Sequence, residues 1–243
     1  MEATTHLTVF FDYLWPYTYR VAVWLQSVKE KLGEEIDIHW KCFSLEQAHA
    51  PDGEDLKLWE RPDADSGSLK ALQAAKCAQL QGNLLFDPFH LLLFEAFHKE
   101  KKDTNNDRVL QEIAQEARLD VDRFMEDFKS NESCKLVGQD HSEALEKYEV
   151  FGVPTLVFDE SRPCFLKLGR LPDSKQEHVI FFKEIKEVIV ARPYLLEMKR
   201  TWSSWQSAVH RLHQMPPDCY FFISGICIFS LRSLHAREIG RLF

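Results

Sequence analysis

Hydrophobic positions in the first forty residues alternate between strand and helix patterns. The run from His6 to Asp12 is short, apolar and rich in β-branched and aromatic residues, which is typical of a buried strand. Pro16 follows at a position suited to the first helical turn, and apolar residues then recur at helical spacing until Gly33. A second alternating run, from Ile36 to about Phe43, predicts another strand. We therefore expect a βαβ opening whose two strands are parallel.

The middle of the chain, about residues 66 to 148, has helical periodicity throughout and no strand signal. Asp87 is expected to cap a helix whose first residue is Pro88. Asn106 and Asp120 each precede a further apolar stretch of helical period and are expected to be N-caps. The pattern predicts an all-helical insertion of about 80 residues within an α/β fold.

Strand patterns return after the insertion. The segments Thr155–Phe158 and Cys164–Leu168 are short apolar runs joined by a short link, which favours an antiparallel hairpin. Residues 179–190 predict a closing helix, whereas residues 51–53 and 62–68 have the composition of loops. The predicted fold class is therefore α/β, with a βαβ half and a ββα half separated by the insertion.

The composition changes near residue 200. Residues 201–243 contain no lysine and carry four arginines against two acids, so they are basic while the first 200 residues are strongly acidic. The apolar run from Cys219 to Leu231 is shorter than a membrane-spanning helix requires. We expect a main domain over residues 1–200 and an atypical extension over 201–243. The extension is either a strand or helix packed on the main domain or a poorly ordered appendage.

Charge and cysteine usage narrow the classes of function. The chain has 38 acidic and 30 basic residues and a formal net charge of −8, which disfavours binding to nucleic acid or to an anionic membrane surface. Its six cysteines form no Cys-x-x-Cys motif. Residues 1–8 lack the basic and apolar regions of a secretion signal. These observations predict reduced thiols and a cytoplasmic location.

Histidine spacing does not predict a metal site. His90 and His98, with Glu95 between them, lie on one predicted helix, but zinc-binding helices place histidines four residues apart. His210 and His213 are one turn apart and have no third ligand nearby in the sequence. We expect packed or solvated histidines and no metal.

Two local motifs lie on either side of the predicted helical insertion. Phe11 to Tyr19 places Trp-Pro-Tyr-Thr at the start of the first predicted helix, and Phe151 to Thr155 reads Phe-Gly-Val-Pro-Thr. Over about residues 6–200, the chain resembles the DsbA family of thioredoxin-fold proteins. The resemblance is greatest to the branch with FrnE-like oxidoreductases, 2-hydroxychromene-2-carboxylate isomerases and kappa-class glutathione transferases.

The resemblance implies a thioredoxin-like fold and an oxidoreductase class. In this family the first motif is Cys-Pro-x-Cys, or Ser-Pro-Tyr-Ser in the transferase and isomerase branch. The second motif is a Gly-Val-Pro-Thr loop whose proline is cis and faces the active site. By the same resemblance, the helical insertion forms a lid over a groove between residues 15–18 and 153–155.

The first motif of this chain departs from the family pattern. Trp15 stands where the attacking cysteine would be, and Thr18 stands where the resolving cysteine would be. An indole has no ionisable thiol, so this pair cannot perform dithiol exchange. The residues that the resemblance assigns to substrate or cofactor binding are Pro16, Tyr17, Val153, Pro154 and Thr155.

Three functions remain open at this point. The chain is an oxidoreductase that uses another thiol, such as Cys42 or Cys164, or a redox-inactive copy of one; free cysteines are usually small buried hydrophobes. It is instead a glutathione-dependent isomerase or transferase, in which Thr18 donates a hydrogen bond to the sulfur of glutathione or a similar thiol. Alternatively, the groove binds an extended peptide or a partner without catalysis.

Overall fold

The computed structural model describes residues 4–50, 57–61, 66–159 and 161–199, together with two short strands, β5 (Phe222–Ile223) and β6 (Ile226–Cys227). The predicted loop at 51–53, most of the predicted loop at 62–68 and most of the extension at 201–243 lie outside these residues. The chain forms two compact units, residues 1–196 and 197–243. The second unit contains the antiparallel pair β5–β6, and everything below concerns the first.

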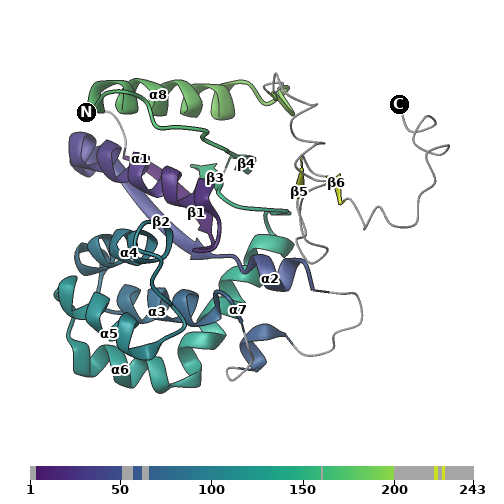
Figure 1. The fold of residues 1–243 in the computed structure, drawn as a ribbon. Helices are drawn as coiled ribbons and strands as arrows, with labels where there is room; N and C mark the ends of the chain where they lie inside the picture. The colour runs from purple at the N-terminus through teal and green to yellow at the C-terminus, as the bar shows by residue number, and fades with distance from the viewer. Residues whose placement is uncertain are drawn as a thin grey trace, which may run out of the picture. The chain divides into compact units, whose positions relative to one another are not determined.

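A four-stranded mixed sheet organises this unit (Figure 1). Its strands are β1 (Thr5–Phe11), β2 (Ile36–Cys42), β3 (Thr155–Phe158) and β4 (Cys164–Phe165), in the order β2-β1-β3-β4. The β1–β2 pair is parallel, whereas β1–β3 and β3–β4 are antiparallel. The predicted α/β class, the parallel opening and the antiparallel hairpin are all confirmed.

Strand β4 is shorter than the predicted run to Leu168. Its ladder pairs Thr155 with Phe165 and stops there. The next amide, of Leu166, donates to the carbonyl of Pro154 at 3.0 Å. Pro154 has no N–H to return a bond, so the ladder cannot continue past it.

Helix α1 (Pro16–Leu32) is the crossover between β1 and β2. Proline in its first turn favours the start, and Gly33, at φ 56°, ends it in a conformation that glycine adopts without a steric penalty. The apolar face of α1 packs against the last helix, α8 (Lys175–Ala191). The indole Nε1 of Trp24 donates to the carbonyl of His178 at 3.0 Å. Helix α8 begins before the predicted residue 179 because Ser174 caps it with its side chain.

The all-helical insertion is present. Its helices are α3 (Leu69–Gln79), α4 (Asn83–His98), α5 (Asp107–Glu116), α6 (Val121–Lys129) and α7 (Asn131–Glu146). Three short elements precede it in the sequence: η1 (Gly33–Glu35), α2 (Leu45–Ala48) and η2 (Leu58–Glu60). Figure 1 shows α8 at one end of the unit and α3, α5 and α6 at the other. Asn106 and Asp120 cap α5 and α6 with their side chains, as predicted.

The predicted start of α4 at Pro88 is wrong. The helix begins at Asn83 after Gly82, and Pro88 lies inside it. Proline removes one helical hydrogen bond, to the carbonyl four residues earlier, but that residue, Leu84, is 92% exposed and open to solvent. Asp87 does not cap; it forms an ion pair with Lys29 of α1 at 2.5 Å.

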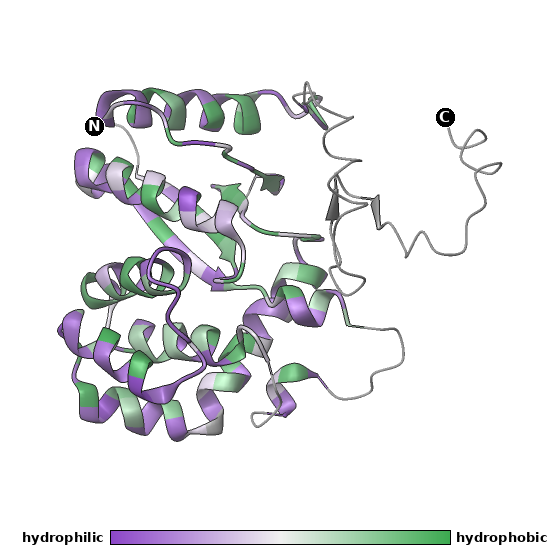
Figure 2. Ribbon diagram, viewed as in Figure 1, coloured by the Kyte–Doolittle hydropathy of each residue, from purple (hydrophilic) through white to green (hydrophobic). Residues whose placement is uncertain are grey.

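Two hydrophobic clusters hold the unit together. The larger one joins one face of the sheet to α1, α8 and the insertion. The smaller one, which we call the second cluster, has the buried members Phe10, Phe43, Ala144, Val150, Val153 and Val157. In Figure 2 β3 is mainly hydrophobic, whereas hydrophobic and hydrophilic colours alternate along β2 and around the helices, as elements with one buried face require. Beside the second cluster, α7 is tied to β2 because Asp140 accepts from the amide of Cys42 and pairs with Lys76.

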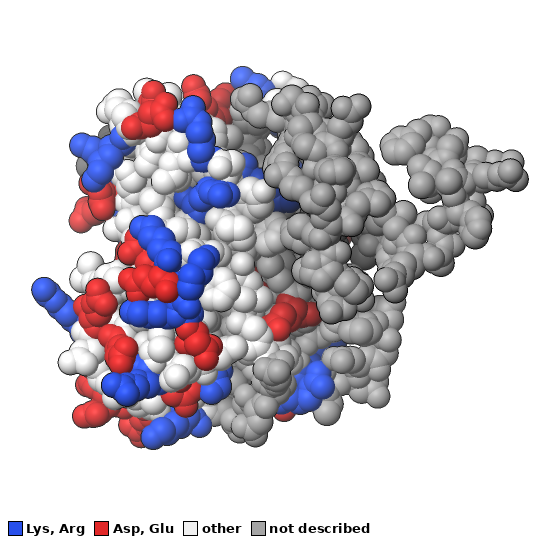
Figure 3. Space-filling view, viewed as in Figure 1, with Lys and Arg blue, Asp and Glu red and all other residues white. Residues whose placement is uncertain are grey.

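Surface charge on this unit is mixed. Figure 3 shows acidic and basic side chains interspersed over the insertion, without a large patch of one sign on that face. Within the described part of the chain, no helix has the length and apolar character needed to cross a membrane.

Candidate functional site

The two motifs meet at the carboxyl end of β1. Trp15 is the N-cap residue of α1, and its half-buried side chain packs against the second cluster, of which Val153 is a member. The ring of Tyr17 lies beside that of Trp15, with centroids 5.4 Å apart. The structure therefore brings together the predicted residues of the first helix and the Val-Pro loop, which are separated by more than 130 positions in the sequence.

The loop Phe151–Thr155, called here the Pro154 loop, has the backbone that the resemblance predicts. The Val153–Pro154 peptide bond is cis. The hydroxyl of Thr155 donates to the carbonyl of Gly152 at 2.7 Å and closes the turn. In the part of the chain that the structure describes, neither the amide nor the carbonyl of Val153 has a hydrogen-bond partner.

Aromatic side chains surround this junction. We call Trp15, Tyr17, Phe151 and Phe165 the aromatic rim. Phe151 is 69% exposed, and its ring lies 5.2 Å from that of Phe165. The ammonium group of Lys167 lies between 5.1 and 5.6 Å from the ring centroids of Trp15, Tyr17 and Phe165, within cation–π range. The rim therefore presents apolar rings together with a positive charge.

Thr18 does not reach the protein surface. The residue is fully buried, and its Oγ1 atom has no hydrogen-bond partner among the described residues. A buried hydroxyl without a partner has lost its hydration and gained nothing in return. The hydroxyl that the resemblance would offer to a thiol cofactor is thus covered by protein.

Asp12, between β1 and the first motif, is a buried carboxylate that sequence reasoning left out of the site. Its oxygens accept from the amides of Leu14 and Leu45, at 2.9 and 2.8 Å, and from the hydroxyl of Ser68 at 3.2 Å. Burial raises the pKa of Asp12 from 3.8 to about 6, against the lowering effect of these bonds, and nearby Glu46 also raises it. The sequence feature that could have identified Asp12 is its position directly after the apolar run that forms β1.

A tyrosine–histidine pair lies behind the site. The hydroxyl of Tyr13 and Nδ1 of His90 are 2.8 Å apart, both side chains are buried, and burial lowers the pKa of His90 to about 3. Nε2 of His98 bonds to the carbonyl of Tyr13 at 2.8 Å. Both histidines are packed, one of the two roles expected for them.

The described thiols are poor nucleophiles. Cys42, Cys77 and Cys134 are buried and Cys164 is half-buried, and all four are free. Burial raises the pKa of each of these thiols. With the pKa raised, each of these four thiols is protonated near neutral pH. A protonated thiol is a poor nucleophile, because the thiolate is the reactive form. Of the two remaining cysteines, Cys219 lies outside the described residues.

Among known proteins, a curated relative is the ClpXP adapter protein SpxH of Shouchella clausii, 32% identical over 133 residues. That alignment covers 54% of this chain but only 42% of the adapter, so the chain spans less than half the length of this relative. The protein YwbO of Bacillus subtilis is 21% identical over 180 residues, which cover 65% of this chain and 88% of YwbO.

Solved structures show the same fold at low sequence identity. Reduced DsbA1 from Neisseria meningitidis matches 78% of this chain and 86% of its own, with a TM-score of 0.52 and 13% identity. A 2-hydroxychromene-2-carboxylate isomerase matches 79% of this chain and all of its own, with a TM-score of 0.54 and 13% identity. The family model of the DSBA-like thioredoxin domain matches residues 6–177. This chain therefore belongs to the family of DSBA-like thioredoxin domains.

Proposed function

We propose that this chain is a redox-inactive DsbA-like domain that binds an extended peptide segment of a partner protein at the Pro154 loop. The observation that carries the proposal is the packing of Trp15, at the position of the attacking cysteine, against the cluster that contains Val153. The side chain that faces the loop is therefore a large apolar surface and not a nucleophile.

The backbone of the Pro154 loop supports peptide binding. Val153 has an amide and a carbonyl without partners among the described residues, and the residue is buried in the second cluster, so a peptide would reach these groups only after neighbouring side chains move aside. An extended peptide can satisfy both groups by pairing with them in β fashion, and side-chain contacts next to the pairing then supply specificity.

The aromatic rim supports a preference for certain peptides. Exposed rings such as Phe151 favour apolar or aromatic side chains, and such residues dominate the energetics of binding surfaces. The positive charge of Arg20, whose guanidinium lies 5.2 Å from the ring centroid of Tyr17, favours carboxylates. The proposed ligand is thus an extended segment with an aromatic and an acidic side chain.

The relationship to SpxH is a second, independent argument for a binding role. That relative is a ClpXP adapter by its name, and an adapter recognises a protein instead of transforming a substrate. We propose partner recognition of this general kind here, and a cytoplasmic location with it, since the described cysteines are free.

Two experiments test the proposal. The first is glutathione-coupled thiol–disulfide exchange with the full chain, Trp15→Cys, and Trp15→Cys combined with Thr18→Cys. We expect no turnover by the unmodified chain and turnover by the double variant. Turnover by the unmodified chain would show that another thiol performs the chemistry.

The second experiment is binding to an array of labelled ten-residue peptides that vary in aromatic and acidic content. Phe151→Ala should weaken binding of the best peptide by about tenfold, the effect of an ordinary interface anchor. Leu84→Ala is the control, because Leu84 is an exposed apolar residue on α4, outside the aromatic rim. Equal affinities of the two variants would contradict the assignment of the rim as the binding surface.

A second candidate function is binding of glutathione or a similar thiol, with the Thr18 hydroxyl donating to its sulfur. The unpartnered Oγ1 atom of Thr18 favours it. The hydroxyl is buried, so the side chains that cover it would have to move to admit a ligand. Calorimetric titration with glutathione distinguishes the two candidates. The second candidate requires that glutathione binds and that Thr18→Val weakens this binding, whereas the peptide-binding proposal does not require glutathione to bind.

A further inference from the structure

Two histidines and a carboxylate converge on one face of the sheet, near the amino ends of β1 and β2. The parallel register sets His6 opposite Asp37. Side chains alternate along a strand, so Asp37 and His39 share a face of β2, and His6 lies on the same face of β1. The opposite face carries buried residues such as Leu7 and Ile38.

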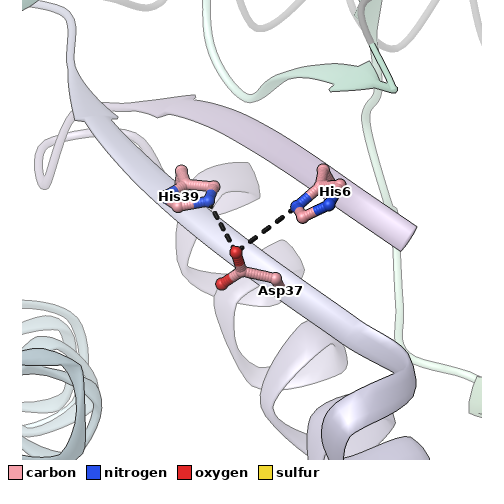
Figure 4. Close-up of side chains that lie close together, drawn as sticks. All are labelled: His6, Asp37 and His39. Carbon is pink, nitrogen blue, oxygen red and sulfur yellow. Dashed lines mark hydrogen bonds and ion pairs between the residues drawn. The ribbon is translucent and has the colours of Figure 1, made fainter. Parts of the chain in front are cut away.

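The donor atoms of this cluster lie at the separations found between ligands of one metal ion. Nδ1 of His6 is 3.4 Å from Oδ2 of Asp37, and Nε2 of His39 is 2.8 Å from the same oxygen (Figure 4). One donor atom from each residue can be chosen so that all three lie within 4.8 Å of one another. Bonds of about 2.1 Å at a tetrahedral angle put neighbouring ligand atoms about 3.4 Å apart. Small rotations of the side chains would therefore bring all three donors onto one ion.

The backbone under the cluster is held on both sides. His6 pairs with β2 on one side, and on the other its amide donates to Oδ1 of Asp159 and its carbonyl accepts from the amide of Asp159, both at 2.8 Å. The nearby ammonium groups are paired as well, Lys186 with Asp159 and Lys41 with Glu143. The strands that carry the three side chains are therefore held in place by hydrogen bonds. The positive charges of these two lysines are balanced by their ion-pair partners and would not strongly repel a metal ion.

We propose that His6, Asp37 and His39 form a binding site for a first-row divalent transition-metal ion. Imidazole nitrogens suit Zn²⁺, Ni²⁺ and Cu²⁺, and the carboxylate adds a negative ligand. The side chains are 63%, 39% and 52% exposed, so an ion can enter from solvent. Three protein ligands leave coordination positions for water or for one donor group of a partner.

This site is independent of the peptide-binding proposal. His6 lies five residues before Phe11, where β1 ends next to the Trp15 motif, and five strand residues span about 17 Å. Either proposal can fail without affecting the other.

Binding of Zn²⁺, Ni²⁺ and Cu²⁺ to the full chain tests the proposal, with calorimetry for affinity and long-range histidine NMR spectra for the residues involved. The variants are His6→Asn, His39→Asn and Asp37→Asn. His49→Asn is the matched control, since His49 is an exposed histidine outside the cluster. Each cluster variant should lose at least about tenfold in affinity, because even partners outside the first coordination shell contribute about that much.

The expected order of affinity places Cu²⁺ above Ni²⁺ and Zn²⁺. Because the ion bridges two strands that meet only in the folded state, it should also raise the melting temperature of the unmodified chain and of His49→Asn. Melting without metal checks that every variant is folded. Unchanged affinity in the cluster variants, or NMR shifts confined to other histidines, would overturn the proposal.

Discussion

Asp12 should contribute stability to this fold that is lost as pH rises from about pH 4 to about pH 7. The carboxyl is buried and its pKa is raised from 3.8 to about 6. Between these values the folded state holds a proton that the unfolded state has released, so the contribution of Asp12 to the free energy of unfolding falls as pH rises. The stabilisation by Asp12 is complete below its pKa in the unfolded state, 3.8, and is lost as pH rises through its pKa in the folded state, about 6.

The size of this effect follows from the two pKa values. One pKa unit corresponds to about 1.4 kcal/mol, so a rise from 3.8 to about 6 corresponds to about 3 kcal/mol. No discount for solvent screening applies, because the carboxyl is fully buried. A loss of this size is a large fraction of the stability of an ordinary domain.

Buried histidines oppose the trend and must be separated from it. Burial lowers the pKa of His90 to about 3 and that of His141 to about 4. Their contributions to stability are present above the unfolded pKa of 6.5 and are lost as pH falls. The informative quantity is therefore the difference between the unmodified chain and Asp12→Asn, in which the histidine contributions cancel.

Urea unfolding at a series of pH values measures this difference. The advantage of the unmodified chain over Asp12→Asn should shrink by about 3 kcal/mol from about pH 4 to about pH 7. Asp107→Asn, at an exposed position, is the control for the loss of one carboxyl group. Glu46→Gln should move the Asp12 curve to lower pH, because a negative charge that raises the pKa of Asp12 is removed. The reasoning would be refuted if the difference in free energy of unfolding between the unmodified chain and Asp12→Asn stayed constant or increased with rising pH.

Three further substitutions test the packing around the site, each by urea unfolding. Thr18→Val should stabilise the fold by about 1 kcal/mol, because it removes a buried hydroxyl without a partner; a loss would mean that the hydroxyl is bonded. Gly138→Ala should cost about 1–3 kcal/mol and change tryptophan fluorescence, because its Cβ would lie 2.4 Å from the Trp59 ring; unchanged stability would show that Trp59 moves freely. Tyr13→Phe should cost about 1–3 kcal/mol, since Nδ1 of His90 loses its partner; a neutral result would argue against that bond.

Features that depend on neighbours in the sequence were predictable. Gly33 ends α1, and Asn106 and Asp120 cap their helices, because backbone sterics and capping act over a few residues. The same local rule failed at Asp87, where an ion pair with Lys29 of another helix replaced the expected cap. Tertiary contacts override local preference in such cases.

The amino-acid sequence by itself determined that the helix starting at Pro16 carries an indole in place of a thiol, since that is a matter of side-chain chemistry. Only the tertiary structure decided that Trp15 packs against the cluster that contains Val153 and that Thr18 is buried without a partner among the described residues. It also decided that His6 and His39 both lie beside Asp37. The physical reason is distance along the chain. Burial, pKa and strand register depend on segments that meet only after folding, and no pattern within one segment records which segment will lie beside it.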